Sequence, residues 1–144
     1  KRLAAILGKG SGLLIGVDLK KDIPVLRAAY NDAKGVTAAF NMNLLSRINA
    51  ELGGDFDLSS FYHDAVYVED LGRIEMRLIS QKSQSVTIGD ETFAFGENEY
   101  IHTESSHKFS LDQFRGICEI AGFTPVASWT DSKSLFSVHY LTAE

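Results

Sequence analysis

The chain has 144 residues, enough for one domain with a hydrophobic core or for part of a larger one. Its net charge of −5 provides no basic field for nucleic acid or anionic lipid, so we expect neither a nucleic-acid nor a membrane partner. A single cysteine, Cys118, excludes an internal disulfide framework, and no secretory signal pattern opens the chain. These features predict a cytoplasmic protein.

The first part of the chain predicts a helix followed by a buried strand. Apolar residues at helical spacing in 1–7 end at Gly8, and this opening reads as the middle of a helix. The continuous apolar run 13–18 has the length of a strand. It suits a strand covered on both faces, as in a parallel sheet.

A long broken helix is expected next. Helical periodicity begins after Asp22, a plausible N-cap, and weakens at Gly35. Thr37 can cap a second helical segment, whose apolar stripe ends at Gly53.

The middle of the chain changes to the alternation typical of antiparallel strands. Residues 61–68 alternate loosely, whereas 73–79 alternate cleanly, with Met76 on the apolar face. Further strand-like pieces follow at 84–88, 92–95 and 99–105, with a hairpin turn at 89–91.

The last part of the chain predicts a helix and two strands. Ser110 and Gln113 have the spacing of a capping box, and the helix that they open ends at Gly122. Cys118 lies on its apolar face, where a cysteine usually acts as a small core residue. Two strands then flank a polar turn at 131–134.

Several familiar sites are not supported. The glycine run 8–12 follows a helix and precedes a strand, which is the reverse of a phosphate-binding loop, so we interpret it as a turn. His102 and His107 have no partner pair at a metal-binding spacing, so no metal site is expected. A serine hydrolase is not supported either, because the sequence has no Gly-x-Ser-x-Gly motif.

Residues 100–109 carry the most informative polar pattern. If 99–106 is extended, His102, Glu104 and Ser106 project to one face, with Met76 available as an apolar wall from a neighbouring strand. A carboxylate beside a hydroxyl could satisfy both nitrogens of an imidazole. The alternative is a polar strand face that contacts only solvent.

Tyr30 is a second candidate, because it precedes the break at Gly35 and its hydroxyl could reach a crevice. A phenol that donates to a ligand carboxylate makes a charge-assisted hydrogen bond. A half-buried helical tyrosine with a hydrated hydroxyl is the alternative.

Several separate segments together resemble one family, the histidine-specific, S-adenosylmethionine-dependent methyltransferases. The similarity runs over essentially the whole chain, and the order and spacing of the segments make it specific. The segments are 16–19, 28–45, 73–78, 101–109 and 135–141.

The resemblance implies an enzyme of ergothioneine synthesis that methylates the α-amine of L-histidine with S-adenosylmethionine as cofactor. It assigns Tyr30 to the substrate carboxylate, Glu104 and Ser106 to the imidazole, and Met76 to the wall of the ring pocket. It assigns no catalytic group and no cofactor-binding residue within this chain, because the family's glycine-rich loop lies upstream of Lys1.

The implied fold is the C-terminal part of a Rossmann-like class I methyltransferase sheet with an antiparallel β substrate-binding insertion. Residues 1–54 and 108–144 would belong to the core and 55–107 to the insertion. Such a substrate-side fragment would be inactive by itself, and it could self-associate through an exposed sheet edge at 13–18.

Two other functions stay open at this point. The first is N-methylation of another amino acid, such as a tryptophan derivative. The second is a non-catalytic module that binds a small molecule or a partner.

Overall fold

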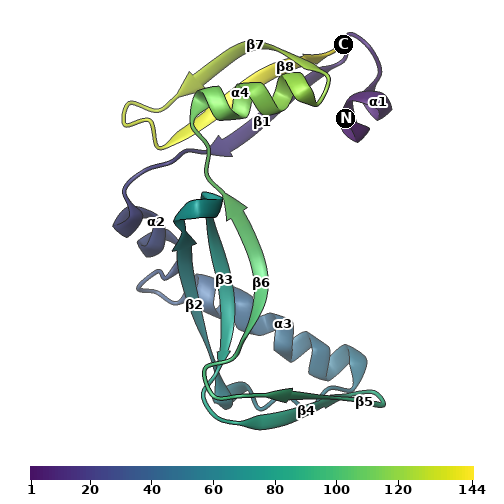
Figure 1. Cartoon of the computed structure of the whole chain (residues 1–144), viewed down its shortest axis with the longest axis vertical. Helices are drawn as coiled ribbons and strands as arrows, with labels where there is room; N and C mark the ends of the chain where they lie inside the picture. The colour runs from purple at the N-terminus through teal and green to yellow at the C-terminus, as the bar shows by residue number, and fades with distance from the viewer. The chain divides into compact units, whose positions relative to one another are not determined.

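The computed structural model describes residues 1–144 and divides into two compact units, each described here by itself. Unit 1 comprises Lys1–Lys21 and His107–Glu144, and unit 2 comprises Asp22–Ser106. Both are mixed α/β structures with antiparallel sheets (Figure 1). None of the helices combines the length and the apolar character needed to cross a membrane.

Unit 1 is a three-stranded sheet with a ten-residue helix packed on one face and a short helix at the start of the chain. Its strands lie in the order β1-β8-β7, so the last strand of the chain sits in the middle. The helix packs on a core that includes Phe114, Cys118 and Leu141, which confirms the expected core position of Cys118. The elements are α1 (Arg2–Leu7), β1 (Gly12–Asp18), α4 (Leu111–Ile120), β7 (Phe123–Thr130) and β8 (Phe136–Ala143).

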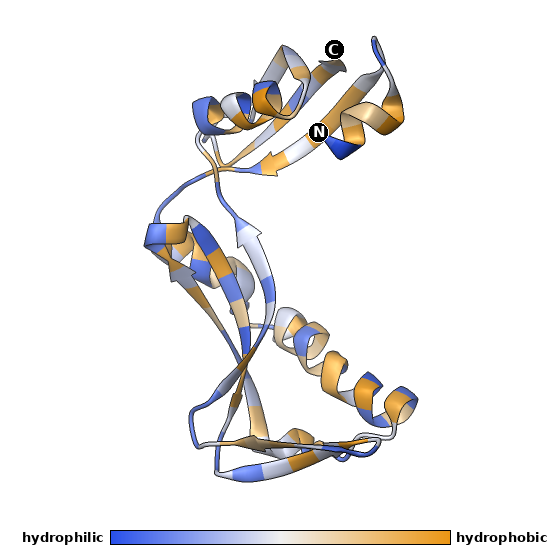
Figure 2. Cartoon of the chain, turned by 45° about the vertical axis from the view of Figure 1, so that its right-hand side comes forward, coloured by the Kyte–Doolittle hydropathy of each residue, from blue (hydrophilic) through white to orange (hydrophobic).

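Strand β1 differs from the expectation of a parallel strand covered on both faces. It pairs antiparallel with β8, because β8 returns beside it after the β7–β8 hairpin. Leu13 and Ile15 pack against the core, whereas the side chain of Leu14 is 66% exposed. Figure 2 shows β1 largely in the apolar colour, so within this chain the strand combines an apolar sequence with one uncovered face.

Unit 2 contains two helices, a three-stranded sheet in the order β2-β3-β6, and a separate hairpin. The strands lie where the sequence predicts them, with bounds that differ by at most two residues. The elements are α2 (Ile23–Tyr30), α3 (Val36–Leu52), β2 (Phe61–Val68), β3 (Arg73–Ser80), β4 (Gln84–Ile88), β5 (Glu91–Phe95) and β6 (Tyr100–His107), with short 3-10 turns at Leu58–Ser60 and Glu69–Leu71.

The start of α3 corrects the predicted cap. Thr37 does not cap this helix; instead the Asp32 carboxylate accepts hydrogen bonds from the backbone N–H groups of Thr37 at 2.8 Å and Val36 at 3.0 Å. These bonds, that of Thr37 first, lower the pKa of Asp32 to about 2. Gly35 makes this possible, because its φ of 69° turns the chain back toward the aspartate.

Two apolar clusters hold unit 2 together. Leu26 of α2 packs on Ala65, Ile74 and Met76 of the sheet. The other cluster joins α3 to the sheet and the β4–β5 hairpin through Leu45, Phe56, Phe61, Leu78 and Val86. The two helices are therefore fixed to the same sheet by separate contacts.

Candidate functional site

The structure brings together two of the residues that the sequence singled out. Tyr30 is the last residue of α2 and Ser106 lies near the end of β6, 76 residues away. The Tyr30 hydroxyl donates a hydrogen bond of 2.7 Å to Ser106 Oγ. Both side chains are half-buried. This contact gives unit 2 a pair of hydroxyl groups that can exchange their mutual bond for bonds to a ligand.

Met76 belongs to the apolar cluster on which Tyr30 packs. It is 3% exposed and belongs to the cluster with Leu26 and Ile74, against which the ring of Tyr30 packs. Its backbone carbonyl accepts a hydrogen bond of 3.0 Å from Thr103 Oγ1 of β6. Met76 therefore belongs to the buried apolar cluster that supports the ring of Tyr30.

Glu104 is exposed and lines a depression of about 220 Å³ between α3 and β6. The other lining side chains are mostly polar, and they include Thr103 from the same strand and Asn41 from the helix. The remaining members are Phe40, Asn43, Leu44 and Arg47. A carboxylate thus borders a concave surface of unit 2.

Residues 100–107 are extended as expected, and the ring of His102 contacts other residues of its own strand. His102 Nε2 lies 3.0 Å from Ser105 Oγ and 3.0 Å from the backbone carbonyl of Glu104. β6 is an edge strand, so only the side that faces β3 is paired. Figure 2 shows its C-terminal part in pale and polar colours.

Glu75 forms an ion cluster with the two arginines on its own strand. Its carboxylate accepts hydrogen bonds from Arg77 Nη2 at 2.7 Å and from Arg73 Nη2 at 2.6 Å. Hydrogen bonds from Arg77 and Arg73, in that order, lower the pKa of Glu75 to about 2. The Arg77 guanidinium also lies 4.1 Å from the centre of the Tyr100 ring. The cluster joins β3 to β6 and keeps Glu75 ionised.

Sequence reasoning missed a polar network around the end of α2. His63 of β2 contacts both the Tyr30 backbone carbonyl and the side chain of Asn41 in α3. Asn41 is only 3% exposed. A signal existed, because Asn41 lies four residues before the buried Leu45 and so occupies the apolar stripe of the helix. Nothing in the sequence pairs it with His63.

The glycine run of unit 1 forms a turn, as predicted, and does not fit a cofactor loop. The N–H of Gly8 donates to the Ala4 carbonyl at 3.0 Å, and that of Gly10 donates to the Ala143 carbonyl at 2.8 Å. The N–H of Ser11 donates to the Gly8 carbonyl. Backbone donors that are used in this way cannot also bind the polar groups of a cofactor.

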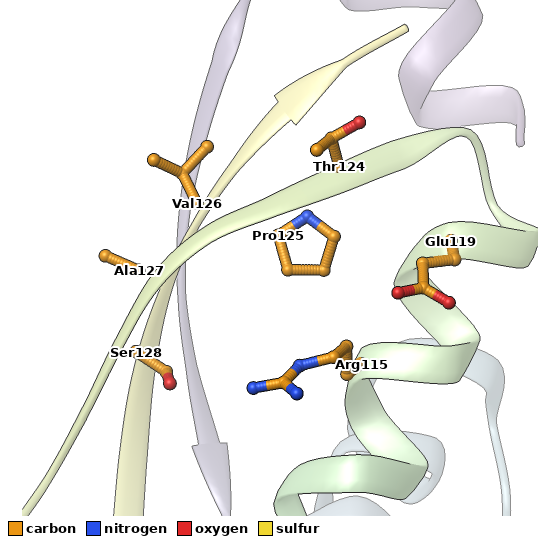
Figure 3. A pocket seen from close by; sticks show the side chains of 7 residues that line it. All are labelled: Arg115, Glu119, Thr124, Pro125, Val126, Ala127 and Ser128. Carbon is orange, nitrogen blue, oxygen red and sulfur yellow. The ribbon is translucent and has the colours of Figure 1, made fainter.

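Unit 1 has a wider depression between α4 and β7, with a volume of about 430 Å³ (Figure 3). Arg115 and Glu119 extend from the helix toward the strand segment 124–128. These two side chains carry opposite charges. None of the residues singled out from the sequence lines this depression. We therefore place the candidate site in unit 2.

Comparison with known proteins gives the family. The model of the histidine-specific, SAM-dependent methyltransferases matches residues 1–143. The chain is 41% identical over 138 residues to the histidine N-alpha-methyltransferase of Mycolicibacterium smegmatis, covering 94% of this chain and 43% of that protein. The protein of the same name from Mycobacterium tuberculosis is 40% identical over 138 residues, with the same 94% and 43% coverage. The L-tryptophan methyltransferase of Psilocybe serbica is 26% identical over 137 residues, covering 94% and 38%.

The chain therefore belongs to the histidine-specific, SAM-dependent methyltransferase family, which confirms the resemblance seen in its sequence. It spans less than half the length of the curated relatives that it matches.

Proposed function

We propose that this chain is the C-terminal, substrate-binding part of an S-adenosylmethionine-dependent enzyme that methylates the α-amine of L-histidine. Up to three transfers would give the trimethyl betaine, a precursor of ergothioneine. The observation that supports this most directly is the bond between Tyr30 and Ser106, together with the packing of Tyr30 on the cluster that contains Met76. Three residues that the resemblance assigns to substrate binding thus gather from α2, β3 and β6.

In the proposed complex, this chain binds and orients the amino acid. The Tyr30 hydroxyl donates to the substrate carboxylate, Glu104 accepts from a ring N–H, and Ser106 pairs with the other ring nitrogen. Substrate binding then replaces the Tyr30–Ser106 bond with bonds to the ligand. The α-amine must be neutral to attack, and catalysis would depend on holding it in an attack geometry.

S-adenosylmethionine would supply the methyl group as an electrophile. We propose that residues outside this chain hold most of it, since the backbone donors of the glycine run bond to carbonyls of unit 1. The isolated chain should therefore be inactive and bind S-adenosylmethionine weakly or not at all. Isothermal titration of the purified chain checks this, and micromolar affinity would contradict it.

We further propose that unit 1 is the end of a Rossmann-like class I sheet. The order β1-β8-β7 supports this, because it leaves β1 at an edge where further strands can add. In the whole enzyme, residues 1–54 and 108–144 would form part of the core and 55–107 the insertion. Within this chain, α2 and α3 pack against the insertion strands, so residues 22–54 group with them in unit 2.

A second candidate function is N-methylation of another amino acid. The similarity to an L-tryptophan methyltransferase supports this alternative. An indole ring offers one N–H donor and no acceptor nitrogen, so it could pair with Glu104 but not satisfy a donating Ser106. This difference favours histidine over tryptophan. A non-catalytic binding module is the remaining alternative.

The test compares two substitutions in the full-length protein that contains this chain. Glu104→Ala should lower kcat/KM for histidine about 10- to 100-fold more than for tryptophan, because it removes a bond to the imidazole. Tyr30→Phe should lower both values about equally, because it affects the shared carboxylate. The measurement is the ratio of the two specificity constants in each variant.

Glu97→Ala is the control, because it removes an exposed carboxylate from the turn before β6. It should leave the ratio unchanged. Equal losses for both amino acids in Glu104→Ala would mean that the carboxylate does not contact the ring, and no turnover of either amino acid by the parent protein would favour the binding module.

A further inference from the structure

The imidazole of His63 bridges the end of α2 and the middle of α3. Its Nε2 lies 2.9 Å from the backbone carbonyl oxygen of Tyr30, and its Nδ1 lies 2.9 Å from Asn41 Nδ2. Asn41 Nδ2 also donates to the Arg77 carbonyl of β3 at 3.3 Å. The ring therefore connects the backbone of Tyr30 to β2 and α3, and through Asn41 to β3.

These contacts determine the tautomer of the ring. A carbonyl oxygen only accepts, so His63 Nε2 must carry the hydrogen. The Asn41 amide nitrogen donates, so Nδ1 must be the bare, accepting nitrogen. The Arg77 carbonyl fixes the orientation of the amide, because a flipped amide would set two oxygens against each other. The network is complete only with a neutral, Nε2-protonated His63.

The next residue along the chain, Asn31, is attached to β2 two residues beyond His63. The Asn31 side chain donates to the Ala65 carbonyl at 2.9 Å and accepts from the Ala65 N–H at 2.9 Å. β2 is an edge strand, and Asn31 uses the backbone groups that its free edge presents. Tyr30 and Asn31 are thus attached to β2 at two positions, His63 and Ala65, which restricts the direction of the Tyr30 side chain.

We infer that His63 and Asn41 are positioning residues, which hold the carbonyl of Tyr30 so that its hydroxyl points to the substrate beside Ser106. This inference rests on the proposed function of Tyr30 and goes beyond it, because neither residue is expected to contact the amino acid through this network. The geometry supports this role: the Tyr30 carbonyl lies at the C-terminal end of α2, where no further turn of the helix can fix it, and His63 Nε2 bonds to it instead. Asn41 also lines the depression that Glu104 borders, so the pair connects the two parts of the candidate site.

The experiment measures L-histidine binding by calorimetry, in the full-length protein with S-adenosylhomocysteine present. His63→Phe keeps a ring but removes both hydrogen bonds, and we expect it to weaken histidine binding roughly ten-fold. His63→Gln retains an amide donor for the Tyr30 carbonyl and should restore most of the affinity. Asn41→Ala should weaken binding in the same direction.

A double-mutant cycle separates positioning from general stability. If His63 acts through the Tyr30 hydroxyl, Tyr30→Phe/His63→Phe should bind histidine about as well as Tyr30→Phe alone. Asn49→Ala is the matched control on α3: its amide makes two bonds of 2.8 Å to the backbone of Phe56, away from Tyr30. It should lower stability without changing histidine affinity.

The outcomes are distinguishable. If Tyr30→Phe itself leaves histidine binding unchanged, the proposed function of Tyr30 fails. If Tyr30→Phe weakens binding but the His63→Phe effect adds to it in full, the positioning role is wrong. A further test needs no substitution: 15N NMR of the imidazole should show hydrogen on Nε2, and hydrogen on Nδ1 would overturn the inference.

Discussion

Glu75 is a carboxylate buried between two guanidinium groups of its own strand, with a side chain that is only 7% exposed. Its two oxygens bond separately to Arg73 and Arg77, whose side chains are 24% and 21% exposed. Removing the carboxylate charge leaves the two guanidinium groups poorly compensated. The resulting loss of folding free energy is larger than for a surface ion pair. This residue is therefore a sensitive probe of unit 2.

Glu75→Gln should lower the free energy of unfolding at pH 7 by on the order of 2 kcal/mol, because it removes charge-assisted hydrogen bonds. The pKa of Glu75 is lowered from an ordinary 4.5 to about 2. Because this pKa is lower in the folded state than in the unfolded state, the ionised carboxylate stabilises the folded state fully above pH 4.5. This stabilisation is lost as the pH falls toward 2. The difference between wild type and variant should shrink accordingly.

Urea unfolding at a series of pH values measures this difference. Asp112→Asn is the control, since Asp112 is 94% exposed and its Arg115 partner is 4.0 Å away. It should change stability by less than about 0.5 kcal/mol. A Glu75→Gln effect that is independent of pH would show that the carboxylate does not carry the stabilisation.

At the scale of elements, the helix α4 can be predicted from local sequence because its start is encoded locally. Ser110 Oγ accepts from the Gln113 N–H at 3.2 Å, and the Gln113 side chain accepts from the Ser110 N–H at 3.0 Å. Ser110→Ala should destabilise unit 1 by about 1 kcal/mol, whereas Ser110→Gly should cost only a few tenths. Chemical unfolding of the three proteins checks this, and equal stability of all three would contradict the capping role.

Two other elements show where local reasoning fails. The cap of α3 comes from Asp32, which reaches the helix only because Gly35 turns the chain. Ser106 of β6 bonds to Tyr30 only because the chain returns beside α2, which alternation alone cannot reveal. In both cases the residue type was visible in the sequence, but its partner depended on how the chain folds back.

At the scale of the whole molecule, β1 is an edge strand with an uncovered apolar face. Leu14 is 66% exposed, and Phe136, Tyr140 and Trp129 of the neighbouring strands are 45%, 38% and 55% exposed. Register pairs Leu14 with Tyr140 and Val138 with Trp129, so these side chains share one face. Such a face and a free edge favour association with another chain.

We expect the isolated chain to self-associate, and Leu14→Lys should reduce this by adding a charge to the exposed face. Sedimentation velocity at several concentrations measures the association. Ile120→Lys is the control, because Ile120 is 72% exposed but lies on α4. A stable monomer at all concentrations would contradict the prediction, and an equal effect of both variants would place the contact elsewhere.

The sequence by itself determined the order and type of nearly every element, because periodicity, glycine stops and the capping box act over a few residues. It also determined the family, through the order and spacing of several separate segments. The tertiary structure decided which residues distant in the sequence contact each other. It brought Tyr30 to Ser106 across 76 residues, paired β1 antiparallel with β8, and set His63 between Tyr30 and Asn41. These contacts follow from how helices and strands pack against each other, and no local pattern in the sequence encodes that packing.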